Sequence, residues 1–400
     1  MKTITRPEIE RAQSVLREHS IGNTPLTSLQ HLISYQHGIV LGKREDANEI
    51  GSYKIRGALY AISQLSPEQR KRGVVCASAG NHAQGVAYAC KLMETQGIIY
   101  MPRTTDAMKI RRVREFGGTW VEVRLVGDYF DEAQKAAKKY QLSNQAVFVH
   151  PFNDRDVIVG QSTVTAEILQ ENPMIHNLVY PAGGGGLMTG GIMARDALGS
   201  SATIIGVEPQ GAPSMTHALN HGKNIALKHV DRFVGGAAVA QVGKNTFDVV
   251  RRSGAEIVLA PEGLVARTML DFHDAGQVVE PAGALGLAGV HMISQKLRGS
   301  VATVVSGRCV SPEMWAEALS LAEKFKGEKA IFDVIFPNRE GALLRLLSML
   351  PSGLNLGDIV HHKSFGPSTT ARIEFEGPAA LVKQVPLLIK KAGFAYSEAE

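Results

Sequence analysis

The sequence predicts a doubly wound α/β fold followed by a small α+β module. From residue 73 onward, short apolar stretches alternate with helix-like segments. Strands that alternate with helices of about 10–15 residues are typical of parallel βαβ units with right-handed crossovers. Near residue 328 the pattern changes to a compact βαββα arrangement of about 70 residues, enough for a small domain. Ligands of doubly wound sheets bind at the carboxyl ends of strands, so a site is expected there.

Hydrophobic periodicity places the elements of the first part in chain order. An amphipathic helix, a turn and a short strand come first, at residues 6–18, 22–26 and 38–43. Strands are then expected at residues 74–77, 97–101, 119–125, 147–149, 177–180, 203–207 and 301–305. Helices are expected at residues 58–65, opened by Lys54, and at 82–93, 107–116, 130–140, 158–170, 187–197, 263–272 and 284–296.

The C-terminal module has a pattern of its own. Its strands are expected at residues 330–336, 355–361 and 369–375, and its helices at residues 341–350 and 379–392. We therefore expect a larger domain at residues 1–327, with a small lobe at about 57–150, and a second domain at residues 328–400.

Composition limits the classes of partner. The chain has 400 residues, of which 44% are hydrophobic and 20% charged, as in ordinary globular proteins with two or three domains. The net charge of +5 is spread thinly. The basic clusters at residues 109–114 and 135–139 alternate with apolar residues at helical spacing, which indicates solvated helix faces. We expect no nucleic-acid partner.

The cysteines and the N-terminus indicate a compartment. Cys76, Cys90 and Cys309 are scattered, with neither metal-ligand spacing nor a disulfide framework, which fits a reducing cytosol. The first residues lack the apolar core of a signal peptide, and no apolar run is long enough to span a bilayer. We expect a cytoplasmic protein with no membrane partner.

The segment at residues 51–57 contains a candidate nucleophile. Lys54 lies between a polar run and a helix start and is followed by Gly57. A lysine can form an imine with an aldehyde cofactor and then act as a base at the substrate's Cα. A single lysine before a glycine is more often a solvated surface residue. Other motifs in the chain are therefore needed to identify Lys54 as a nucleophile.

A run of four glycines follows a predicted strand and precedes a predicted helix. Its residues are Gly183, Gly184, Gly185 and Gly186, with Leu187 next. Consecutive glycines let backbone N–H groups close on an anion, and the helix N-terminus adds its dipole. The context favours a phosphate site over a flexible turn. The run has neither the Gly-Lys-Ser/Thr of a Walker loop nor the spaced glycines of a dinucleotide fingerprint.

Two further strand ends carry polar residues. The segment from Ser78 to His82 links a strand to a helix, so its N–H groups and side chains can hold a substrate carboxylate, and Asn81 can donate to a cofactor ring oxygen. Ordinary helix capping explains the same residues equally well. Ser306 ends another strand and can face a pyridine nitrogen, or be a simple turn residue.

Taken together, these segments resemble threonine deaminase (threonine ammonia-lyase), a family with the tryptophan-synthase-β-like fold (fold type II) of pyridoxal phosphate enzymes. The resemblance rests on residues 52–57, 77–85, 183–187 and 280–284, which read SYKIRG, ASAGNHAQG, GGGGL and EPAGA. It covers roughly residues 20–325, in order, and is specific as a set. Residues 336–343 resemble the single ACT-like regulatory module of the shorter biosynthetic enzymes.

The resemblance implies a cofactor, pyridoxal 5'-phosphate, and a role for each motif. Lys54 would hold the cofactor covalently, Asn81 would contact its ring oxygen and Ser306 would face its pyridine nitrogen. The phosphate would lie on Gly183, Gly184, Gly185, Gly186 and Leu187. Ser78 and His82 would lie in the loop that receives the substrate carboxylate.

The activity that the resemblance implies is β-elimination and deamination of L-threonine to 2-oxobutanoate and ammonia, the first step of isoleucine biosynthesis. Isoleucine is the expected effector, acting through the C-terminal module, and relatives are commonly oligomers, so a homotetramer or homodimer is expected. The alternatives are a lyase for serine or a modified amino acid, and a regulator that binds an amino acid without catalysis. The intact Lys54 argues against the regulator.

The sequence departs from related families at a few positions. Related serine racemases place a serine where this chain has Ala79, and an alanine cannot transfer a proton, so racemisation is not expected. Ser214 replaces an acidic ligand of the racemases' metal site, which also includes Glu208 and Ala212, so no metal is expected. Arg308 follows the Ser-Gly of the cofactor-ring segment and is unusual there; it can alter the cofactor, select the substrate or point to solvent.

The C-terminal module departs from its family as well. Glu340 stands where ACT-like modules often carry proline, which bears on effector binding.

Overall fold

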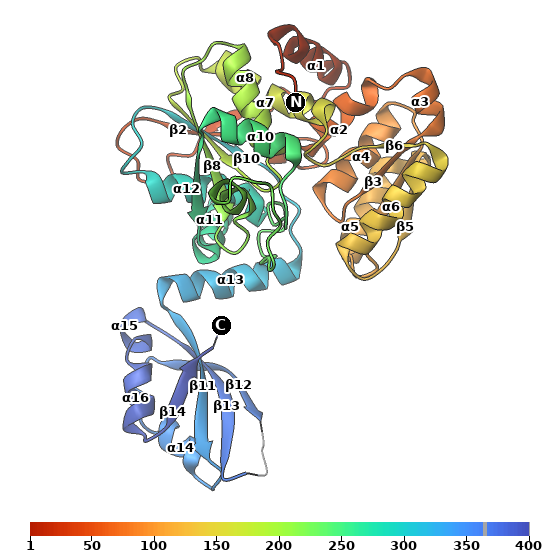
Figure 1. The fold of residues 1–400 in the computed structure, drawn as a ribbon. Helices are drawn as coiled ribbons and strands as arrows, with labels where there is room; N and C mark the ends of the chain where they lie inside the picture. Colours follow the sequence, from red (N-terminus) through yellow and green to blue (C-terminus); the bar gives the residue numbers. More distant parts are fainter. Residues whose placement is uncertain (363–365, 400) are drawn as a thin grey trace. The chain divides into compact units, whose positions relative to one another are not determined.

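The computed structural model describes residues 1–362 and 366–399, and the chain divides into two compact units, Met1–Met314 and Trp315–Glu400 (Figure 1). The division falls near the start of helix α13 (Pro312–Lys326), whereas the sequence places the change of pattern near residue 328, after this helix. Helix α13 buries only two alanines along its length, Ala318 and Ala322.

The first unit contains a large mixed sheet that is parallel except at one edge. Its six strands are, in sheet order, β1 (Leu26–Ser28), β2 (Val40–Arg44), β10 (Val301–Val305), β7 (Asn177–Pro181), β8 (Thr203–Pro209) and β9 (Glu256–Ala260). Within this sheet β1 is antiparallel to its neighbour and the other pairs are parallel. The order reverses between β10 and β7, so the loops that follow these two strands open at the same edge of the sheet, at a topological switch point.

Helices cover both faces of this sheet. Successive residues of a strand face opposite ways. In β8, Gly206 therefore lies against Met188 of α8, and Val207 lies against Gly289 of α12. The strands β7 and β10 are buried along their whole length, which explains their continuous apolar runs. The helices of this part are α1 (Arg6–Glu18), α2 (Lys54–Ser63), α7 (Arg155–Glu171), α8 (Gly186–Ala197), α9 (Ser214–Asn220), α10 (Lys244–Ser253), α11 (Glu262–Asp274) and α12 (Pro281–Ile293).

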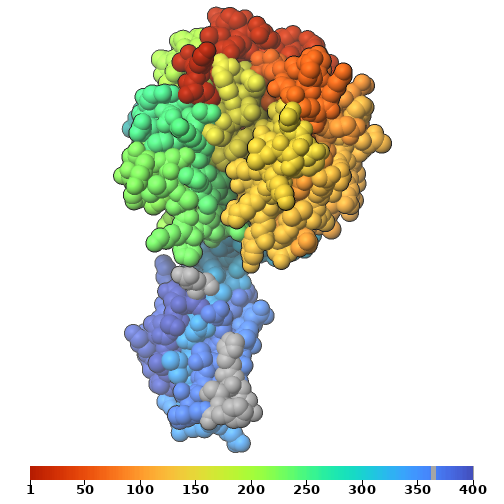
Figure 2. All heavy atoms as spheres, turned by 45° about the vertical axis from the view of Figure 1, so that its right-hand side comes forward, coloured from red at the N-terminus to blue at the C-terminus, as the bar shows by residue number. Residues whose placement is uncertain are grey.

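A smaller lobe of the first unit is built on a four-stranded parallel sheet of order β5-β4-β3-β6. Its strands are β3 (Val74–Ala77), β4 (Gly97–Met101), β5 (Val121–Leu125) and β6 (Val147–Phe148), and its helices are α3 (Pro67–Arg72), α4 (Asn81–Leu92), α5 (Ala107–Gly117) and α6 (Phe130–Asn144). Val74 and Cys76 pack with α2 and α4, and Val75 and Ala77 pack against α6. Figure 2 shows the orange and yellow residues of this lobe lying directly against the green residues of the larger one.

The C-terminal unit contains a four-stranded antiparallel sheet of order β12-β13-β11-β14. Its strands are β11 (Lys329–Pro337), β12 (Asn355–His362), β13 (Ser368–Glu376) and β14 (Ala395–Glu398), and its helices are α14 (Ala342–Leu347), α15 (Ala379–Val382) and α16 (Val385–Lys391). The sequence predicts three strands, and the structure adds β14, whose exposed, mixed side chains give little strand signal. The single helix expected at 379–392 is two short helices, because Pro386 begins a new turn. The unit is an α+β fold consistent with an ACT-like module.

The structure also supplies elements that the sequence leaves unassigned. Between residues 208 and 262 it has α9, α10 and β9, which have short or mixed apolar patterns. The short helices η1 (Glu45–Ala47) and η2 (Gly118–Trp120) complete the first unit, and η2 shortens the strand expected from residue 119. In the described part of the chain, no helix is long and apolar enough to cross a membrane.

Candidate active site

Lys54 is the first residue of α2, and its side chain is half-buried between the two lobes of the first unit. Its Nζ donates a hydrogen bond of 3.0 Å to the carbonyl oxygen of Pro151 and lies 5.0 Å from the centre of the Tyr53 ring. Helix α4 approaches the backbone of Lys54 at Gly85, where an added Cβ would come within 3.1 Å of the Lys54 carbonyl. The amine is therefore held at the site by a hydrogen bond to a backbone carbonyl, which a substrate or cofactor group can replace.

Two histidines beside Lys54 are neutral at pH 7. Burial, and then the positive charge of Lys54, lower the pKa of His82 to about 3. The same two causes lower the pKa of His150 to about 4. The Nε2 atom of His82 lies 2.9 Å from the carbonyl oxygen of Val149 and therefore carries the proton, which leaves its buried Nδ1 as an acceptor without a hydrogen-bond partner among the described residues.

Backbone pairing fixes Lys54 relative to Ser306. Ser52 forms an isolated antiparallel bridge with Gly307, and the N–H of Tyr53 donates to the carbonyl oxygen of Ser306 at 3.3 Å. The backbone at the end of β10 is thus hydrogen-bonded to the loop that precedes α2. Because of this pairing, residues separated by about 250 positions in the chain lie at one place, and their separation in space is fixed by backbone hydrogen bonds.

The glycine run forms the loop between β7 and α8. Gly185 adopts a φ of +86°, in the left-handed region that favours glycine, and is the N-cap of the 12-residue helix α8. An added Cβ at Gly184 would overlap the ring of Phe152. The hydroxyl of Thr246 donates to the carbonyl oxygen of Gly184 at 2.7 Å and holds the loop in place. The first N–H groups of α8, which include those of Gly186 and Leu187, have no partner within the helix and can bind an anion.

The loop that follows β3 opens α4 in the small lobe. The Oγ of Ser78 accepts a hydrogen bond of 3.3 Å from the N–H of Gly80, and Asn81 and His82 begin the 12-residue helix. The N-cap is Gly80, which has no side chain to cap the helix, so the N–H groups of the first helical turn, which have no intrahelical acceptor, are available to a ligand.

A buried carboxyl group links this loop to the end of β10. Oε1 of Glu280 accepts a hydrogen bond of 2.6 Å from Nδ2 of Asn81, and its Oε2 accepts one of 3.2 Å from the N–H of Cys309. Burial raises the pKa of Glu280 to about 7, against the lowering effect of these hydrogen bonds. Ser306 lies next to this group, and its hydroxyl donates to the carbonyl oxygen of Ala282 at 2.9 Å.

The site fits a phosphorylated ring cofactor with an aldehyde. Polar atoms that are buried without a hydrogen-bond partner among the described residues include Oγ of Ser52, Oδ1 of Asn81 and Nδ1 of His82. Buried polar groups are normally paired, so these atoms indicate that a polar ligand completes the site. The glycine loop offers N–H groups to a phosphate, and Lys54 offers the amine.

The structure brings the segments that carry the predicted site residues to the carboxyl ends of β3, β7 and β10. These residues are Lys54, Ser78, Asn81, His82, Gly183, Gly184, Gly185, Gly186, Leu187 and Ser306. The sequence gives no separate role to Glu280, although this residue is part of the EPAGA segment. The sequence also gives no signal for Thr246, which lies in the region where no elements are predicted.

Two residues that depart from related families, Arg308 and Ser214, have definite surroundings, and so does Glu208 beside Ser214. Arg308 is exposed, and its stem lies across Gly51, at the entrance to the Lys54 loop. Glu208 accepts hydrogen bonds from the N–H groups of Met215 and Thr216 at 2.6 and 2.9 Å and from the hydroxyl of Ser214 at 3.4 Å. The carboxylate therefore caps the start of α9.

Behind Lys54, helix α2 is anchored by a buried group of charges that the sequence does not reveal. Arg56 forms ion pairs with Glu45 at 2.8 Å and with Glu167 at 2.6 Å, and Lys43 pairs with Glu167 at 2.9 Å. Two positive and two negative groups balance, and all four residues are buried. Burial alone would raise the pKa of Glu167, but the attraction and hydrogen bonding of Arg56 and Lys43 outweigh it and lower the pKa to about 2. The network joins α2, η1, β2 and α7.

Comparisons with known proteins identify the family of the chain. The profile of the pyridoxal-phosphate dependent enzyme family matches residues 17–307. The biosynthetic L-threonine dehydratase of Lactococcus lactis subsp. lactis is 38% identical over 352 residues, which cover 86% of this chain and 84% of the relative. The L-threonine ammonia-lyase of Thermotoga maritima is 36% identical over 377 residues, which cover 93% of both chains.

Solved structures show the same fold. The processed form of threonine deaminase isoform 2 from Solanum lycopersicum matches with a TM-score of 0.74 and 33% identity, over 80% of this chain and 97% of that chain. Maize serine racemase matches with a TM-score of 0.73 and 29% identity, over 80% and 97% of the two chains. The chain therefore belongs to the family of pyridoxal-phosphate dependent enzymes of fold type II, and pyridoxal 5'-phosphate is its cofactor. Within that family it is similar to the threonine dehydratases, also called threonine deaminases or ammonia-lyases.

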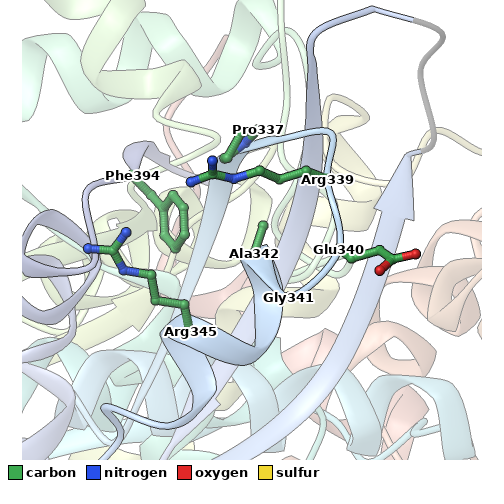
Figure 3. A pocket seen from close by; sticks show the side chains of 7 residues that line it. All are labelled: Pro337, Arg339, Glu340, Gly341, Ala342, Arg345 and Phe394. Carbon is green, nitrogen blue, oxygen red and sulfur yellow. The ribbon is translucent and has the colours of Figure 1, made fainter.

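A separate hollow lies in the C-terminal unit. It has a volume of about 300 Å³ and is lined by Pro337, Arg339, Glu340, Gly341, Ala342, Arg345 and Phe394. Figure 3 shows Arg339 and Arg345 extending on either side of the Phe394 ring, while Glu340 points away from them. The hollow therefore offers two cationic groups and an apolar ring, which suits a small ligand that has a carboxylate and an apolar side chain.

Proposed function

We propose that this protein is a threonine ammonia-lyase, which converts L-threonine to 2-oxobutanoate and ammonia in the first step of isoleucine biosynthesis. The observation that carries the proposal is the meeting of Lys54, the glycine loop and Ser306 at the carboxyl ends of adjacent elements. The proposal is supported by relatives named threonine dehydratase or ammonia-lyase that match most of the chain.

The residues of the site then have the following roles. Nζ of Lys54 holds the cofactor and, when the substrate amine has replaced it, takes the proton from the substrate's Cα. The cofactor supplies an electron sink for the charge left on that carbon. The N–H groups of residues 183–187 would hold the phosphate. The Asn81 amide would donate to the ring oxygen, and the uncharged hydroxyl of Ser306 would face the pyridine nitrogen. The substrate carboxylate would bind at the loop that contains Ser78 and His82, through backbone N–H groups at the start of α4, because the unprotonated Nδ1 of His82 cannot donate to it.

Elimination is favoured over racemisation because one face of the site lacks a proton donor. A racemase needs a second acid on the face opposite Lys54, and Ala79 has no transferable proton. Without a donor on that face, Cα cannot regain a proton there. The β-hydroxyl group leaves as water after it receives a proton, and the proton that Lys54 takes from Cα balances this loss.

A keto-acid assay with several amino acids tests this function. We expect 2-oxobutanoate from threonine. The variant Arg308→Ala should keep the same ratio of rates, because the Arg308 side chain is exposed. If threonine gave no product, and serine or a modified amino acid did, the substrate assignment would be wrong; product from no amino acid would favour a non-catalytic binding role.

The second unit is assigned to regulation. In this assignment residues 1–327 carry catalysis, residues 328–400 form the regulatory domain, and isoleucine binds in the hollow beside Arg339 and Arg345. The guanidinium groups would hold its carboxylate and Phe394 would contact its side chain. A homo-oligomer in the cytoplasm is the expected working form, and light scattering of the purified protein measures its mass.

A further inference from the structure

Glu280 is a buried acid that the roles above do not use. The residue is 6% exposed, and its carboxyl oxygens have two donors, Nδ2 of Asn81 and the N–H of Cys309. A second observation concerns Gly307, where an added Cβ would collide with Oε1 of Glu280 and would lie 3.0 Å from Nδ2 of Asn81. The contact between the acid and the amide therefore requires a glycine directly after Ser306.

The Asn81 amide has two possible orientations, and its partner decides between them. Nδ2 can only donate and Oδ1 can only accept. An ionised carboxylate only accepts, so it holds Nδ2 toward itself and turns Oδ1 away; Oδ1 is buried and has no hydrogen-bond partner among the described residues. Because Nδ2 carries two hydrogens and Glu280 takes one, the second is free to donate to a ligand.

We propose that Glu280 is a positioning residue that fixes the orientation of the Asn81 amide, so that Asn81 presents an N–H group to the ring oxygen of the cofactor. The inference rests on the proposed cofactor contact of Asn81. Glu280 acts through Asn81 and takes no proton from the substrate.

The burial of Glu280 adds a pH dependence to this arrangement. Its pKa is raised to about 7, first by burial, and the donors and the nearby positive charges of Lys109 and Lys54 only partly oppose this. As the pH falls through this value, the carboxyl group gains a proton and can donate to Oδ1 of Asn81, so the amide is free to turn. The preference for one orientation is therefore strongest above pH 7.

The variant Glu280→Gln should reverse the orientation of the Asn81 side-chain amide. The N–H of Cys309 can only donate, so it takes the oxygen of the new side-chain amide, and the NH₂ group of that amide then faces Asn81. Asn81 must turn Oδ1 toward this donor, and its own N–H groups move away from their original place. The substitution keeps the size of the side chain while it changes the direction of the hydrogen bond.

The test measures the binding of pyridoxal 5'-phosphate to the full-length protein and the pH dependence of its visible absorbance. We expect Glu280→Gln and Asn81→Ala each to weaken cofactor binding about tenfold and to move the pH midpoint of the absorbance in the same direction. In the double variant the effect of Glu280→Gln should disappear, because its target is gone. Glu208→Gln is the matched control: it removes another buried carboxyl group and should leave both measurements unchanged.

Several results would overturn the inference. One is a Glu280→Gln protein with wild-type affinity and spectrum; another is a full effect of this substitution in the Asn81→Ala background. If Glu280→Gln does not fold, Glu280→Asp shortens the acid so that it no longer reaches Nδ2 of Asn81, and it must reproduce the spectral shift. If the wild-type protein failed to bind the cofactor, the proposed function and this inference would both be overturned. If the wild-type protein bound the cofactor and Glu280→Gln changed neither affinity nor spectrum, only the inference would be overturned.

Discussion

At the residue scale, the amine of Lys54 donates to the carbonyl oxygen of Pro151 at 3.0 Å. The two histidines beside it are neutral at pH 7, so they neither add a charge next to the amine nor compete with it for a proton. This environment leaves the amine available for an aldehyde. The role that we propose for Lys54 is consistent with this position and can be tested directly.

The variant Lys54→Ala should lose the visible absorbance of the bound cofactor and lower turnover of threonine roughly 10²–10⁴-fold, since both the covalent link and the base are removed. Lys54→Arg is the control, because it keeps the positive charge and cannot form the link; it should be equally inactive. Borohydride reduction of the wild-type protein, followed by peptide mapping, should place the label on Lys54. A label on any other side chain would contradict the assignment.

The depressed pKa of His82 predicts a loss of stability in mild acid. A histidine with an ordinary pKa of about 6.5 when unfolded and about 3 when folded takes up a proton on unfolding between these values, so stability is fully present above pH 6.5 and falls as the pH decreases. The loss from this group should be about 1 kcal/mol between pH 6.5 and 5.5. Unfolding curves at several pH values measure it.

The variant His82→Gln should flatten this dependence, and His37→Gln, a change at an exposed histidine, should not. An unchanged slope in His82→Gln would show that His82 is not the group responsible. His150, whose pKa is lowered to about 4, adds to the slope in the same pH range.

At the scale of elements, helix α2 depends on a charge network and not only on apolar packing. Arg56 has no exposed surface, and its forked guanidinium group donates hydrogen bonds to carboxylates and hydroxyls, chiefly those of Glu45 and Glu167. Removing one member of such a network leaves buried charges without a partner. The network therefore fixes the position of the helix that begins with Lys54.

We expect Arg56→Ala to reduce the free energy of unfolding by about 3–5 kcal/mol. Arg56→Lys should also be destabilising, because an ammonium group cannot form the forked contacts with two carboxylates. Arg6→Ala is the control, because it removes an exposed pair with Glu10 and should cost less than about 1 kcal/mol. Urea unfolding measures all three, and an Arg56→Ala protein as stable as Arg6→Ala would refute the role of the network.

At the scale of the whole molecule, the two units have separate cores and separate chemistry. The first unit contains the residues assigned to catalysis, and the C-terminal unit has its own apolar cluster beneath a single sheet. Its hollow is lined by two arginines and an aromatic ring. Regulation of one unit by a ligand of the other would require a coupling free energy between them, which kinetics can measure.

Arg339→Ala and Arg345→Ala should each weaken inhibition by isoleucine about tenfold while leaving turnover without isoleucine unchanged, because each removes a donor to the carboxylate. Lys383→Ala, a change at an exposed cation outside the hollow, is the control. Inhibition curves with threonine as substrate provide the measurement. Wild-type sensitivity in both arginine variants would place the effector site elsewhere.

Much of the fold could be predicted from local pattern. The strands expected at residues 74–77 and 97–101 coincide with β3 and β4, because a buried parallel strand is apolar along its length and ends at a turn. The local pattern does not predict the elements between residues 208 and 262, since α9 and β9 are short and their apolar residues are mixed with polar ones. The last strand, β14, is mostly exposed and gave no signal for the same reason.

The candidate site was predicted in part. The sequence identifies Lys54, the glycine run and the Ser78–His82 loop, because amines and consecutive glycines at strand ends have a recognisable chemistry. It does not reveal that Glu280 contacts Asn81, or that Arg56 is buried between two glutamates. These contacts join segments about 200 and 110 positions apart, which no local pattern relates.

By itself, then, the sequence determined the alternation of strands and helices, the chemistry available at their ends and the resemblance to threonine deaminases. Tertiary structure decided which of those ends meet: the order of the strands in two sheets and the pairing of Ser52 with Gly307 bring Lys54, Asn81 and Ser306 to one site. The physical reason is that side-chain periodicity reports only whether a face is buried, whereas backbone hydrogen bonds between distant strands and the balance of buried charges fix what it is buried against.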